Sequence, residues 1–457
     1  MCNLSIYYLM KCFKRNLNPN NAKSLSKMSN SHISKSIYQL DISPPKFRGQ
    51  LNKDIRCSVA IIGGGLTGIS TALSLCEKGF DVCLFEAGNI GDGGSGRNGG
   101  QICQGWSSSF EKLSKYIDPE FKEDMWQTGL EGPNLIKERI KKYKIECDVH
   151  WGYVHTAIHK GHMRELEAYQ KSFEAHGYNH LLALNNKSSL FNYICSDAYI
   201  GGLYDAGSGH LHPLKYLIGL SKAASIAGAK IYTNSSISSI QTANNKNKLI
   251  TKQGNSVIAE QLVICGNAYL GAVSPKNMRG KIAPVTSSVM ATEPLNSTEI
   301  KSAIPSRAAI ADGNTALNYF RIDKQNRMIF GGRASYLNTD PINVEKDLKK
   351  RMRAVFPDLM HKKIQQAWSG RIGITVNRLP HFGRISDSAI YVQGYSGHGV
   401  AFSGVAGNIL SDAVSGKKDR FNQLTKILHL PFPGGPLRTP ILALGMGWYK
   451  MRDYFHI

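Results

Sequence analysis

The sequence has few of the features that mark membrane, secreted or zinc-binding proteins. None of its apolar runs, such as residues 441–446, approaches the roughly 20 residues that a membrane-spanning helix needs. Its nine cysteines are an odd number and form no Cys-x-x-Cys pair, which argues against a disulfide framework and a structural zinc site. We therefore expect a soluble protein with no transmembrane segment and no bound metal, located in the reducing cytoplasm.

Acidic residues are scarce: 33 Asp and Glu face 56 Lys and Arg, which gives a net charge of +23 over 457 residues. An excess of this size can indicate nucleic acid or an anionic membrane as partner. About a third of it lies in residues 1–56, and the remainder is spread thinly. No basic helix, zinc finger or aromatic RNA-binding motif accompanies the charge, so we expect a solvated basic surface and no nucleic-acid partner.

The first 40 residues contain no Asp or Glu and many Ser and Asn. This composition is typical of an organellar transit peptide, although such peptides are rich in Arg and this segment has only Arg15. A disordered tail, or a true start at Met28, fits the same residues. We predict that residues 1–50 form a basic leader, disordered or targeting, outside the folded domains.

The first strongly patterned segment reads as a strand, a glycine turn, a helix and a second strand within about thirty residues. Residues 57–62 are apolar, the turn spans 63–68, an amphipathic helix ends at Gly79, and residues 82–85 form the second strand, closed by Glu86. In such a unit the glycines allow a tight turn and close backbone approach to a pyrophosphate, which sits on the helix amino end. Glu86 stands where a carboxylate would bind ribose hydroxyls.

This unit predicts a dinucleotide site. The residues that we expect to contact the nucleotide are Gly63, Gly65, Leu66, Thr67, Gly68, Glu86 and Ala87.

The next segment, residues 91–101, is a glycine-rich loop, so backbone rather than side chains contacts something flat or anionic there. At residues 95–101, Ser-Gly-Arg-Asn-Gly-Gly-Gln, the sequence resembles the flavin-dependent D-amino-acid-oxidase-like amine oxidases, in which this segment covers the flavin and its pyrophosphate. The resemblance implies FAD as the cofactor. The residues that it adds to the cofactor site are Ser95, Gly96, Arg97, Asn98, Gly99, Gly100 and Gln101.

A later strand and glycine loop, residues 391–403, precede a small apolar helix over 404–414. A loop of this kind at a helix amino end favours anions. The resemblance implies that its backbone N–H groups point at the flavin edge where negative charge develops on reduction. The residues we assign to the cofactor here are Gly397, His398, Gly399 and Val400, together with Gly266 after the strand 261–265. His398 either acts as an acid-base group or shapes the loop.

Three further residues are candidate substrate contacts. His210 and His212 lie in residues 204–213, which we expect to form a loop facing the ligand, and Arg333 follows two glycines that permit close approach. A pair of histidines of this kind is more often structural than a ligand contact, whereas for Arg333 a packing or solvent-facing role fits equally well.

The order of elements predicts an α/β protein with two domains. One is a Rossmann-like FAD-binding domain, interrupted along the chain, and the other is a substrate domain whose alternating strands over 281–356 indicate an antiparallel sheet. We assign residues 55–150, 205–275 and 368–420 to the FAD-binding domain, 151–204 and 276–367 to the substrate domain, and 421–457 to a C-terminal extension.

Within that family the chain resembles the gamma-glutamylputrescine oxidoreductases from about Cys57 onward. The resemblance rests on residues 63–68, 95–101, 209–213, 266–269, 330–333, 380–384, 394–400 and 431–435. It implies oxidation of the terminal primary amine of gamma-glutamylputrescine, a step of putrescine catabolism, to the aldehyde, with oxygen as acceptor and release of ammonia and hydrogen peroxide.

Three further expectations accompany this resemblance. The FAD is non-covalent, because no cysteine lies between residues 330 and 400. Ala401 stands where sarcosine-type relatives carry a lysine, so no cation is needed beside the reacting carbon. The alternatives are a related amine or amino-acid dehydrogenase that uses a quinone, and a flavin-dependent tRNA-modifying protein.

Overall fold

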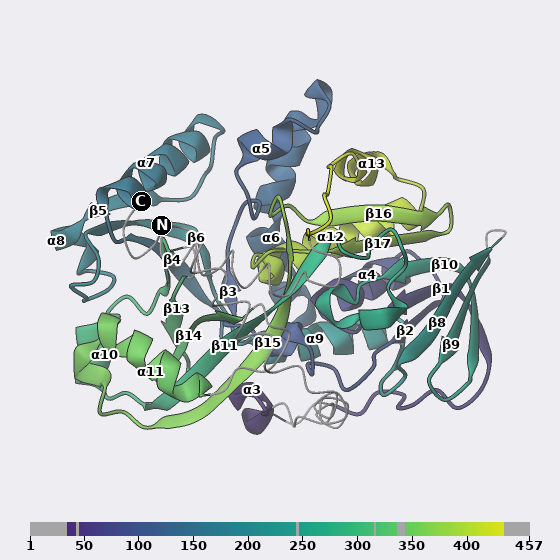
Figure 1. Ribbon diagram of the computed structural model, residues 1–457, viewed down its shortest axis with the longest axis horizontal. Coiled ribbons are helices and arrows are strands. Elements are labelled where there is room, and N and C mark those ends of the chain that lie inside the picture. Colours follow the sequence, from purple (N-terminus) through teal and green to yellow (C-terminus); the bar gives the residue numbers. More distant parts are fainter. Residues whose placement is uncertain (1–33, 43–44, 244–245, 315–316, 336–342, 434–457) are drawn as a thin grey trace, which may run out of the picture. The chain divides into compact units, whose positions relative to one another are not determined.

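The computed structural model describes residues 34–42, 45–243, 246–314, 317–335 and 343–433. Eight strands form its first sheet. Its main path runs in the order β16 (His381–Ser386), β17 (Ala389–Gln393), β10 (Ser256–Ile264), β1 (Ile55–Ile62), β2 (Val82–Phe85) and β7 (Lys230–Tyr232). From β17 to β7 all neighbours are parallel, whereas β16 is antiparallel to β17. A hairpin of β8 (Ile237–Ala243) and β9 (Lys246–Thr251) extends from β10. The predicted Rossmann-like α/β arrangement is confirmed (Figure 1).

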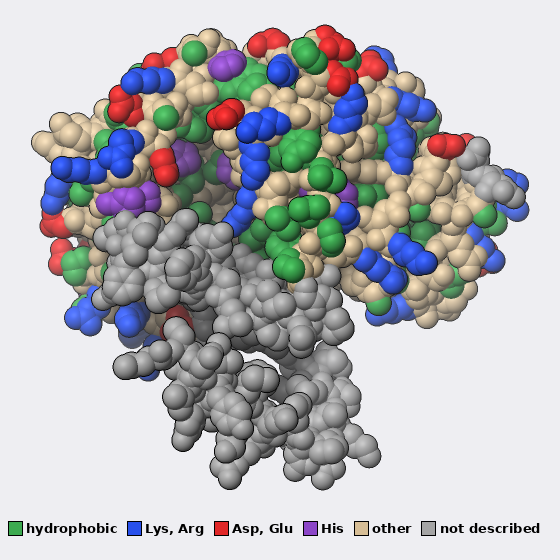
Figure 2. Space-filling model, turned by 45° about the horizontal axis from the view of Figure 1, so that its top comes forward, with side chains coloured by type: hydrophobic (Ala, Val, Ile, Leu, Met, Phe, Trp, Pro, Cys, Tyr) green, Lys and Arg blue, Asp and Glu red, His purple; other side chains and the backbone are tan. Residues whose placement is uncertain are grey.

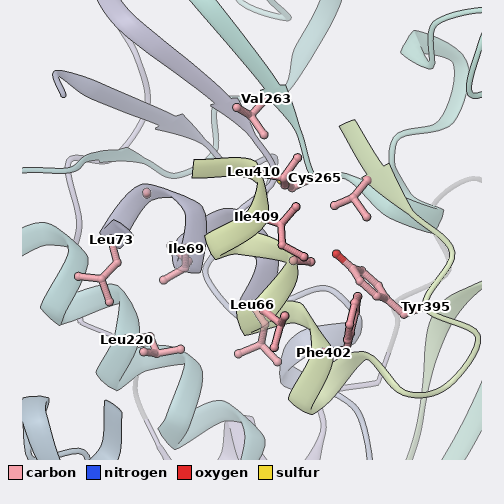
Figure 3. Packing of buried hydrophobic residues seen from close by; sticks show 14 of the residues in the cluster. Leu66, Ile69, Leu73, Leu220, Val263, Cys265, Tyr395, Phe402, Ile409 and Leu410 are labelled. Atoms are coloured by element: carbon pink, nitrogen blue, oxygen red, sulfur yellow. The ribbon is translucent and has the colours of Figure 1, made fainter. Parts of the chain in front are cut away.

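Three helices cover this sheet on the side shown in Figure 3: α4 (Leu66–Glu77), α9 (Pro213–Ile226) and α12 (Gly399–Val414). Their apolar side chains, among them Leu66, Ile69 and Ile409, form one buried cluster with strand residues such as Val263. Small residues let the helices approach closely, since a methyl group added at Gly407 would lie 2.6 Å from Ser70 Cβ. Each fully buried large apolar side chain contributes about 1.5–3 kcal/mol to folding.

The second sheet has nine strands. Its order is β15 (Ile364–Thr375), β11 (Ile282–Pro294), β14 (Arg327–Ser335), β13 (Tyr319–Ile322), β12 (Ala309–Asp312), β4 (His150–Ala157), β6 (Gly201–His210) and β3 (Gln101–Ile102), with β5 (Leu182–Asn186) also paired to β6. All pairs are antiparallel except β12 with β4. The predicted antiparallel second sheet is therefore present, and it recruits strands from segments far apart in the sequence.

Helices cover both faces of this second sheet. On one face α10 (Ser297–Ala303) and α11 (Val344–Val355) bury apolar side chains such as Leu348 and Met352. The other face meets α7 (Lys160–Ala175) and α6 (Lys122–Tyr143), which share a cluster of rings around Trp126 and Phe173. The shorter helices are α5 (Phe110–Ser114), α8 (Lys187–Leu190) and α13 (Asp419–Thr425).

Residues 204–210, which we expected to form a loop, belong to strand β6. Two glycines in this segment are a turn signal, but regular backbone pairing with β4 and β5 prevails over it. Glycine suits this position because a methyl group at Gly209 would lie 2.3 Å from the His150 carbonyl oxygen. Our boundaries at 205 and 368 accordingly fall inside two strands of the second sheet, β6 and β15.

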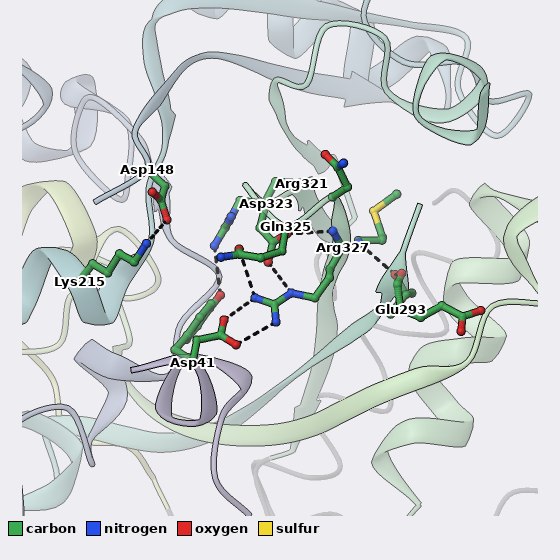
Figure 4. Close-up of polar contacts among 12 residues, drawn as sticks. Asp41, Asp148, Lys215, Glu293, Arg321, Asp323, Gln325 and Arg327 are labelled. Atoms are coloured by element: carbon green, nitrogen blue, oxygen red, sulfur yellow. Dashed lines mark hydrogen bonds and ion pairs between the residues drawn. The ribbon is translucent and has the colours of Figure 1, made fainter. Parts of the chain in front are cut away.

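The predicted leader is wrong from Lys35 onward, because these residues are part of the fold. Helix α3 (Ile37–Asp41) begins with a capping box formed by Ser36 and Gln39. Tyr38 is fully buried, with its ring against Trp368. In Figure 4, Asp41 faces the guanidinium of Arg327, and their closest atoms are 2.5 Å apart. Composition alone does not reveal such anchoring; residues 1–33 and 434–457 lie outside the described part of the chain.

The described residues contain no helix long and apolar enough to cross a membrane. In the same part of the chain no group of three or more His, Cys, Asp or Glu side chains is placed to hold a metal ion. The seven described cysteines are free thiols. On the face shown in Figure 2, Lys and Arg side chains lie scattered among Asp and Glu.

Candidate active site

The first glycine turn, residues 63–68, connects β1 to the amino end of α4. Gly63 has a φ of +105°, and a methyl group there would lie 2.9 Å from the Cys265 carbonyl oxygen. At Gly68 the added methyl would lie 1.9 Å from the Gly63 carbonyl oxygen, so only glycine lets the helix start so close to the turn. The Leu66 N–H donates to Ser95 Oγ at 3.0 Å. An oxygen atom therefore already lies at the helix amino end, where the dipole favours a phosphate oxygen.

Glu86 ends strand β2 beside this turn. Its carboxylate accepts N–H groups from Gly64 at 2.7 Å and from Gly88 at 3.0 Å. Removal from water raises the pKa of Glu86, while these two N–H groups act in the opposite direction. Glu86, followed by Ala87, is thus fixed by backbone at the edge where the ribose of a dinucleotide would lie.

Two side chains of the loop of residues 95–101, those of Arg97 and Asn98, help to hold it in place. Asn98 donates to the Gly94 and Ser95 carbonyl oxygens, and its own oxygen accepts the Gly100 N–H. The Arg97 guanidinium donates to the Ser369 carbonyl oxygen at 2.7 Å and to Gln39 Oε1 at 3.0 Å. These contacts direct Arg97 and Asn98 into the protein.

Two further side chains bind carbonyl oxygens of the same loop. Trp368 Nε1 donates to Arg97 O at 2.8 Å, and Arg321 Nε donates to Gly99 O at 2.7 Å. Backbone at Gly96, Gly99 and Gly100 is thereby fixed in place. Sequence reasoning missed Arg321, which is 2% exposed, because a lone arginine in a strand carries no spacing signal.

The loop of residues 95–101 is the second glycine turn. The third, residues 394–400, lies beside the first. Gly394 and Gly397 have φ angles of +80° and +107°, and helix α12 begins at Gly399 with His398 as its N-cap residue. We had placed this helix start at 404, since the glycines of the turn read as loop. The Tyr395 hydroxyl is 2.7 Å from Thr67 Oγ1 of α4.

The segment after β10 also meets these turns. Asn267, which follows Gly266, accepts the Gly394 N–H at 3.0 Å through Oδ1. Three glycine-bearing segments therefore converge at the carboxyl ends of β1, β10 and β17, where ligands of open parallel sheets bind.

His398 is neutral at physiological pH in this arrangement. Removal from water lowers its pKa to about 4, the charge of His155 acts in the same direction, and the Gly105 backbone opposes both. Its Nδ1 is buried and has no hydrogen-bond partner among the described residues. The imidazole ring thus stands at the start of α12 with a polar atom available to a ligand.

The other candidate histidines have structural contacts. His210 lies 3.0 Å through Nε2 from the Arg307 carbonyl oxygen and stacks on His150, and burial lowers its pKa well below the usual value. His212 caps α9 by accepting the Lys215 N–H at 3.2 Å, and burial lowers its pKa to about 3. Arg333 lies in β14 opposite Ser288; its side chain is outside the described part of the structure.

The face of the second sheet that carries Tyr153 of β4 contains polar groups that our sequence analysis did not single out. Tyr153 and Asp205 are paired across β4 and β6, so their side chains share one face, and the Tyr153 hydroxyl donates to Gln101 Oε1 at 3.1 Å. On β13, Tyr319 packs against Gly99, where an added methyl would lie 2.6 Å from its ring. This sheet face therefore lies next to the loop of residues 95–101.

These residues fit a flavin dinucleotide. A glycine turn at a helix amino end suits the pyrophosphate, Glu86 suits the ribose, and the N–H groups at the start of α12 suit an electron-rich ring. The methyl clashes at Gly63 and Gly68 show that the turn exists only with glycine at these positions. An orphaned Nδ1 on His398 marks a polar atom that a bound molecule would satisfy.

A family model named DAO, FAD dependent oxidoreductase, matches residues 58–413, which include all three turns. The chain belongs to this family. The oxidoreductase is 35% identical over 404 residues to gamma-glutamylputrescine oxidoreductase of Escherichia coli, covering 88% of this chain and 94% of that enzyme. It is also 36% identical over 408 residues to the probable oxidoreductase OrdL of Haemophilus influenzae, covering 87% and 92%.

Among solved structures, the oxidoreductase is similar to glycine oxidase from Geobacillus kaustophilus. The TM-score is 0.66 at 20% identity, over 79% of this chain and 95% of that chain. The expected fold, the resemblance to gamma-glutamylputrescine oxidoreductases and the dependence on FAD are confirmed.

Proposed function

We propose that this FAD-dependent oxidoreductase oxidises the terminal primary amine of gamma-glutamylputrescine. Two electrons and two protons leave the carbon and nitrogen of the amine to give an imine, which water hydrolyses to the aldehyde and ammonia. Dioxygen takes the two electrons and two protons and becomes hydrogen peroxide. The observation that carries the proposal is the 35% identity to the Escherichia coli enzyme over nearly the whole of both chains. The seven free thiols favour a reducing compartment such as the cytoplasm.

The cofactor would be held by backbone and without a covalent bond. When bound, FAD supplies the two-electron acceptor for this chemistry. Residues 63–68, Glu86 and the loop 95–101 would hold its nucleotide and pyrophosphate. The first N–H groups of α12, at Gly399 and Val400, are fixed before the reaction and would stabilise negative charge at the ring. No cysteine lies between residues 330 and 400 to form a covalent link.

The surroundings of His398 favour the neutral amine that reacts. A protonated nitrogen has no lone pair to donate as the carbon–hydrogen bond breaks. Burial lowers the pKa of His398 to about 4 and also lowers that of His155, so both rings are uncharged near pH 7. The same removal from water lowers the pKa of a bound ammonium group and releases its proton more readily.

The position of Ala401 is consistent with an amine that carries no neighbouring carboxylate. Ala401 is 2% exposed and faces α6, where a methyl group added to Gly132 would lie 2.9 Å from Ala401 Cβ. Helix α6 leaves no room there for a longer cationic side chain. The described residues around His398 therefore present no lysine at this position to attract an amino-acid carboxylate.

Anaerobic mixing with a panel of amines tests the substrate. We expect gamma-glutamylputrescine to bleach the flavin absorbance faster than putrescine, glycine or sarcosine at equal concentration. Faster bleaching by glycine or sarcosine would contradict the proposal.

Peroxide measurement under air tests the electron acceptor. We expect one hydrogen peroxide for each amine consumed. Rapid bleaching without peroxide, relieved by an added quinone, would instead identify a dehydrogenase.

A further inference from the structure

A buried carboxylate lies in the middle of β6 without a counter-charge. Asp205 is 1% exposed. Its Oδ1 accepts the Tyr178 hydroxyl at 2.8 Å and the Gly207 N–H at 2.9 Å. Its Oδ2 has no hydrogen-bond partner among the described residues, and within them no Lys or Arg forms an ion pair with it. A buried charge left with one oxygen unsatisfied is costly, so this oxygen points to a ligand.

Aromatic rings surround Asp205. Tyr153 lies directly opposite on β4, and Tyr169 comes from α7. Burial raises the pKa values of Tyr153, Tyr169 and Tyr178, and the Asp205 charge raises them further, so all three phenols stay neutral. A carboxylate among neutral phenols attracts a cation and disfavours a second anion.

An open pocket adjoins this group of residues. It lies between α6 and residues 177–180, and Tyr178 and Gly207, the two donors to Asp205, are part of its wall. The pocket wall carries the amides of Gln104, Gln127, Asn134 and Asn179, together with the His180 ring and the Tyr178 hydroxyl. Gln104 also lies beside Tyr169 and Tyr178, whose pKa values its side chain lowers by hydrogen bonding.

Asp205 also lies within electrostatic reach of the residues beside the third turn. Its charge raises the pKa of His155, whose own charge lowers the pKa of His398 at the start of α12. His155 thus lies close enough to interact with both Asp205 and His398. His155 is on the same face of β4 as Tyr153, and their ring centroids are 4.6 Å apart.

We propose that Asp205 is the residue that binds the substrate's amine and excludes amino acids. Oδ2 accepts an N–H from the amine nitrogen while the phenol rings enclose the carbon chain. Its charge opposes the loss of the ammonium proton, which removal from water favours. The polar remainder of the substrate stays in the pocket against the amides of residues 104, 127, 134 and 179. A substrate with a carboxylate next to its nitrogen would be repelled by the Asp205 charge. This inference rests on the proposed function and names the group that recognises its substrate class.

A simple amine tests the inference without turnover of gamma-glutamylputrescine. We would titrate n-butylamine and n-butyrate into the flavin-loaded enzyme and follow the flavin spectrum and the melting temperature. The expected result is saturable binding of n-butylamine and none of n-butyrate. In Asp205→Asn, which keeps size and shape, n-butylamine should bind at least tenfold more weakly with unchanged flavin content, and Asp205→Glu should restore part of the affinity. Equal affinity in Asp205→Asn and wild type would overturn the proposal.

Two further variants keep the test decisive. Asp197→Asn removes an exposed carboxylate from the same domain and should leave n-butylamine binding unchanged. Asn134→Lys places a cation on an exposed helix position in the pocket wall, where folding is not at risk. It should weaken n-butylamine binding several-fold, and an unchanged affinity would exclude this pocket as the amine's path. Should gamma-glutamylputrescine fail as substrate while n-butylamine binding depends on Asp205, the proposed function alone would fall.

Discussion

The nucleotide side of this enzyme comprises residues 63–68, Glu86, 95–101 and 394–400. It and the sheet face around Asp205 present polar groups through different parts of the chain. Residues 63–68 and 394–400 offer backbone N–H groups at helix starts, fixed by glycine conformations. The face of β4 and β6 offers side chains, a carboxylate and several phenols, brought together by strand pairing. A backbone site is rigid and indifferent to the substrate, whereas a side-chain site can differ between relatives of one fold. The comparison teaches that the common cofactor and the particular substrate are recognised by separable structures.

The strongest way to break the nucleotide side is Gly68→Ala. Its new methyl would lie 1.9 Å from the Gly63 carbonyl oxygen, so the turn must move away from α4. We expect protein with no retained flavin and a free energy of unfolding lowered by several kcal/mol, read from absorbance after desalting and from thermal melts.

Gly93→Ala is the matched control for this change. Gly93 has φ −85° and its added methyl would meet nothing closer than 3.8 Å, so flavin should be retained. Full flavin content in Gly68→Ala would contradict the role given to the turn.

Tyr38→Ala breaks the anchor that joins α3 to both regions. The Tyr38 hydroxyl accepts from Arg321, which holds Gly99, and its ring packs on Trp368. We expect a loss of about 3–5 kcal/mol in the free energy of unfolding, measured by urea denaturation, because a fully buried ring is removed. Leu40→Ala, on the same helix but 57% exposed, should change it by less than about 0.5 kcal/mol. Similar losses in the two variants would show that α3 is not anchored as described.

Acid should weaken the enzyme through buried histidines on both sides of the comparison. Burial lowers the pKa values of His398 and His429 to about 4 and those of His212 and His381 to about 3. Below pH 6.5 the unfolded chain binds protons that the folded chain does not. The contribution of these histidines to the free energy of unfolding is therefore fully present above pH 6.5 and is lost as the pH falls toward 4. Each histidine contributes a slope of about 1.4 kcal/mol per pH unit.

Urea denaturation between pH 7 and pH 4.5 measures this slope. In His429→Leu the free energy of unfolding should fall less steeply with decreasing pH, by about 1.4 kcal/mol per pH unit. A stability that stays flat over this range would contradict the burial of these rings.

Glu86→Gln sharpens the comparison, because Glu86 is the one carboxylate assigned to the nucleotide side. The amide keeps one acceptor oxygen but loses the charge that binds the Gly64 and Gly88 N–H groups. We expect FAD to bind about tenfold more weakly, the equivalent of about 1.4 kcal/mol, in titrations of the apoprotein by flavin fluorescence. Glu77→Gln, at the other end of α4, should bind FAD as wild type does.

Sequence patterns predicted the parts of the structure that are determined by residues close together along the chain. The unit β1, α4 and β2 lies within two residues of its expected bounds, because apolar runs and glycine spacing directly determine a strand–turn–helix–strand unit. Strand β6 was mistaken for a loop, because its glycines serve close strand contact rather than turning. Helix α3 was missed because the burial of Tyr38 depends on partners more than 150 residues away.

The sheet face around Asp205 could not be predicted from the sequence for a related reason. Asp205 is a single carboxylate in a segment that was read as a loop, and its significance comes from Tyr153 and Tyr178, which strand pairing brings to it. No spacing along the chain encodes that meeting. Its unsatisfied oxygen becomes visible only when burial and hydrogen bonds are known together.

A crystal structure of the flavin-loaded enzyme with bound n-butylamine tests the central claim most directly. The account predicts FAD between the turns at 63–68 and 394–400, and the amine nitrogen about 2.7–3.2 Å from an Asp205 oxygen, on the side of the flavin ring that faces β4 and β6. An amine nitrogen bound elsewhere, with Asp205 still lacking a partner at Oδ2, would contradict it.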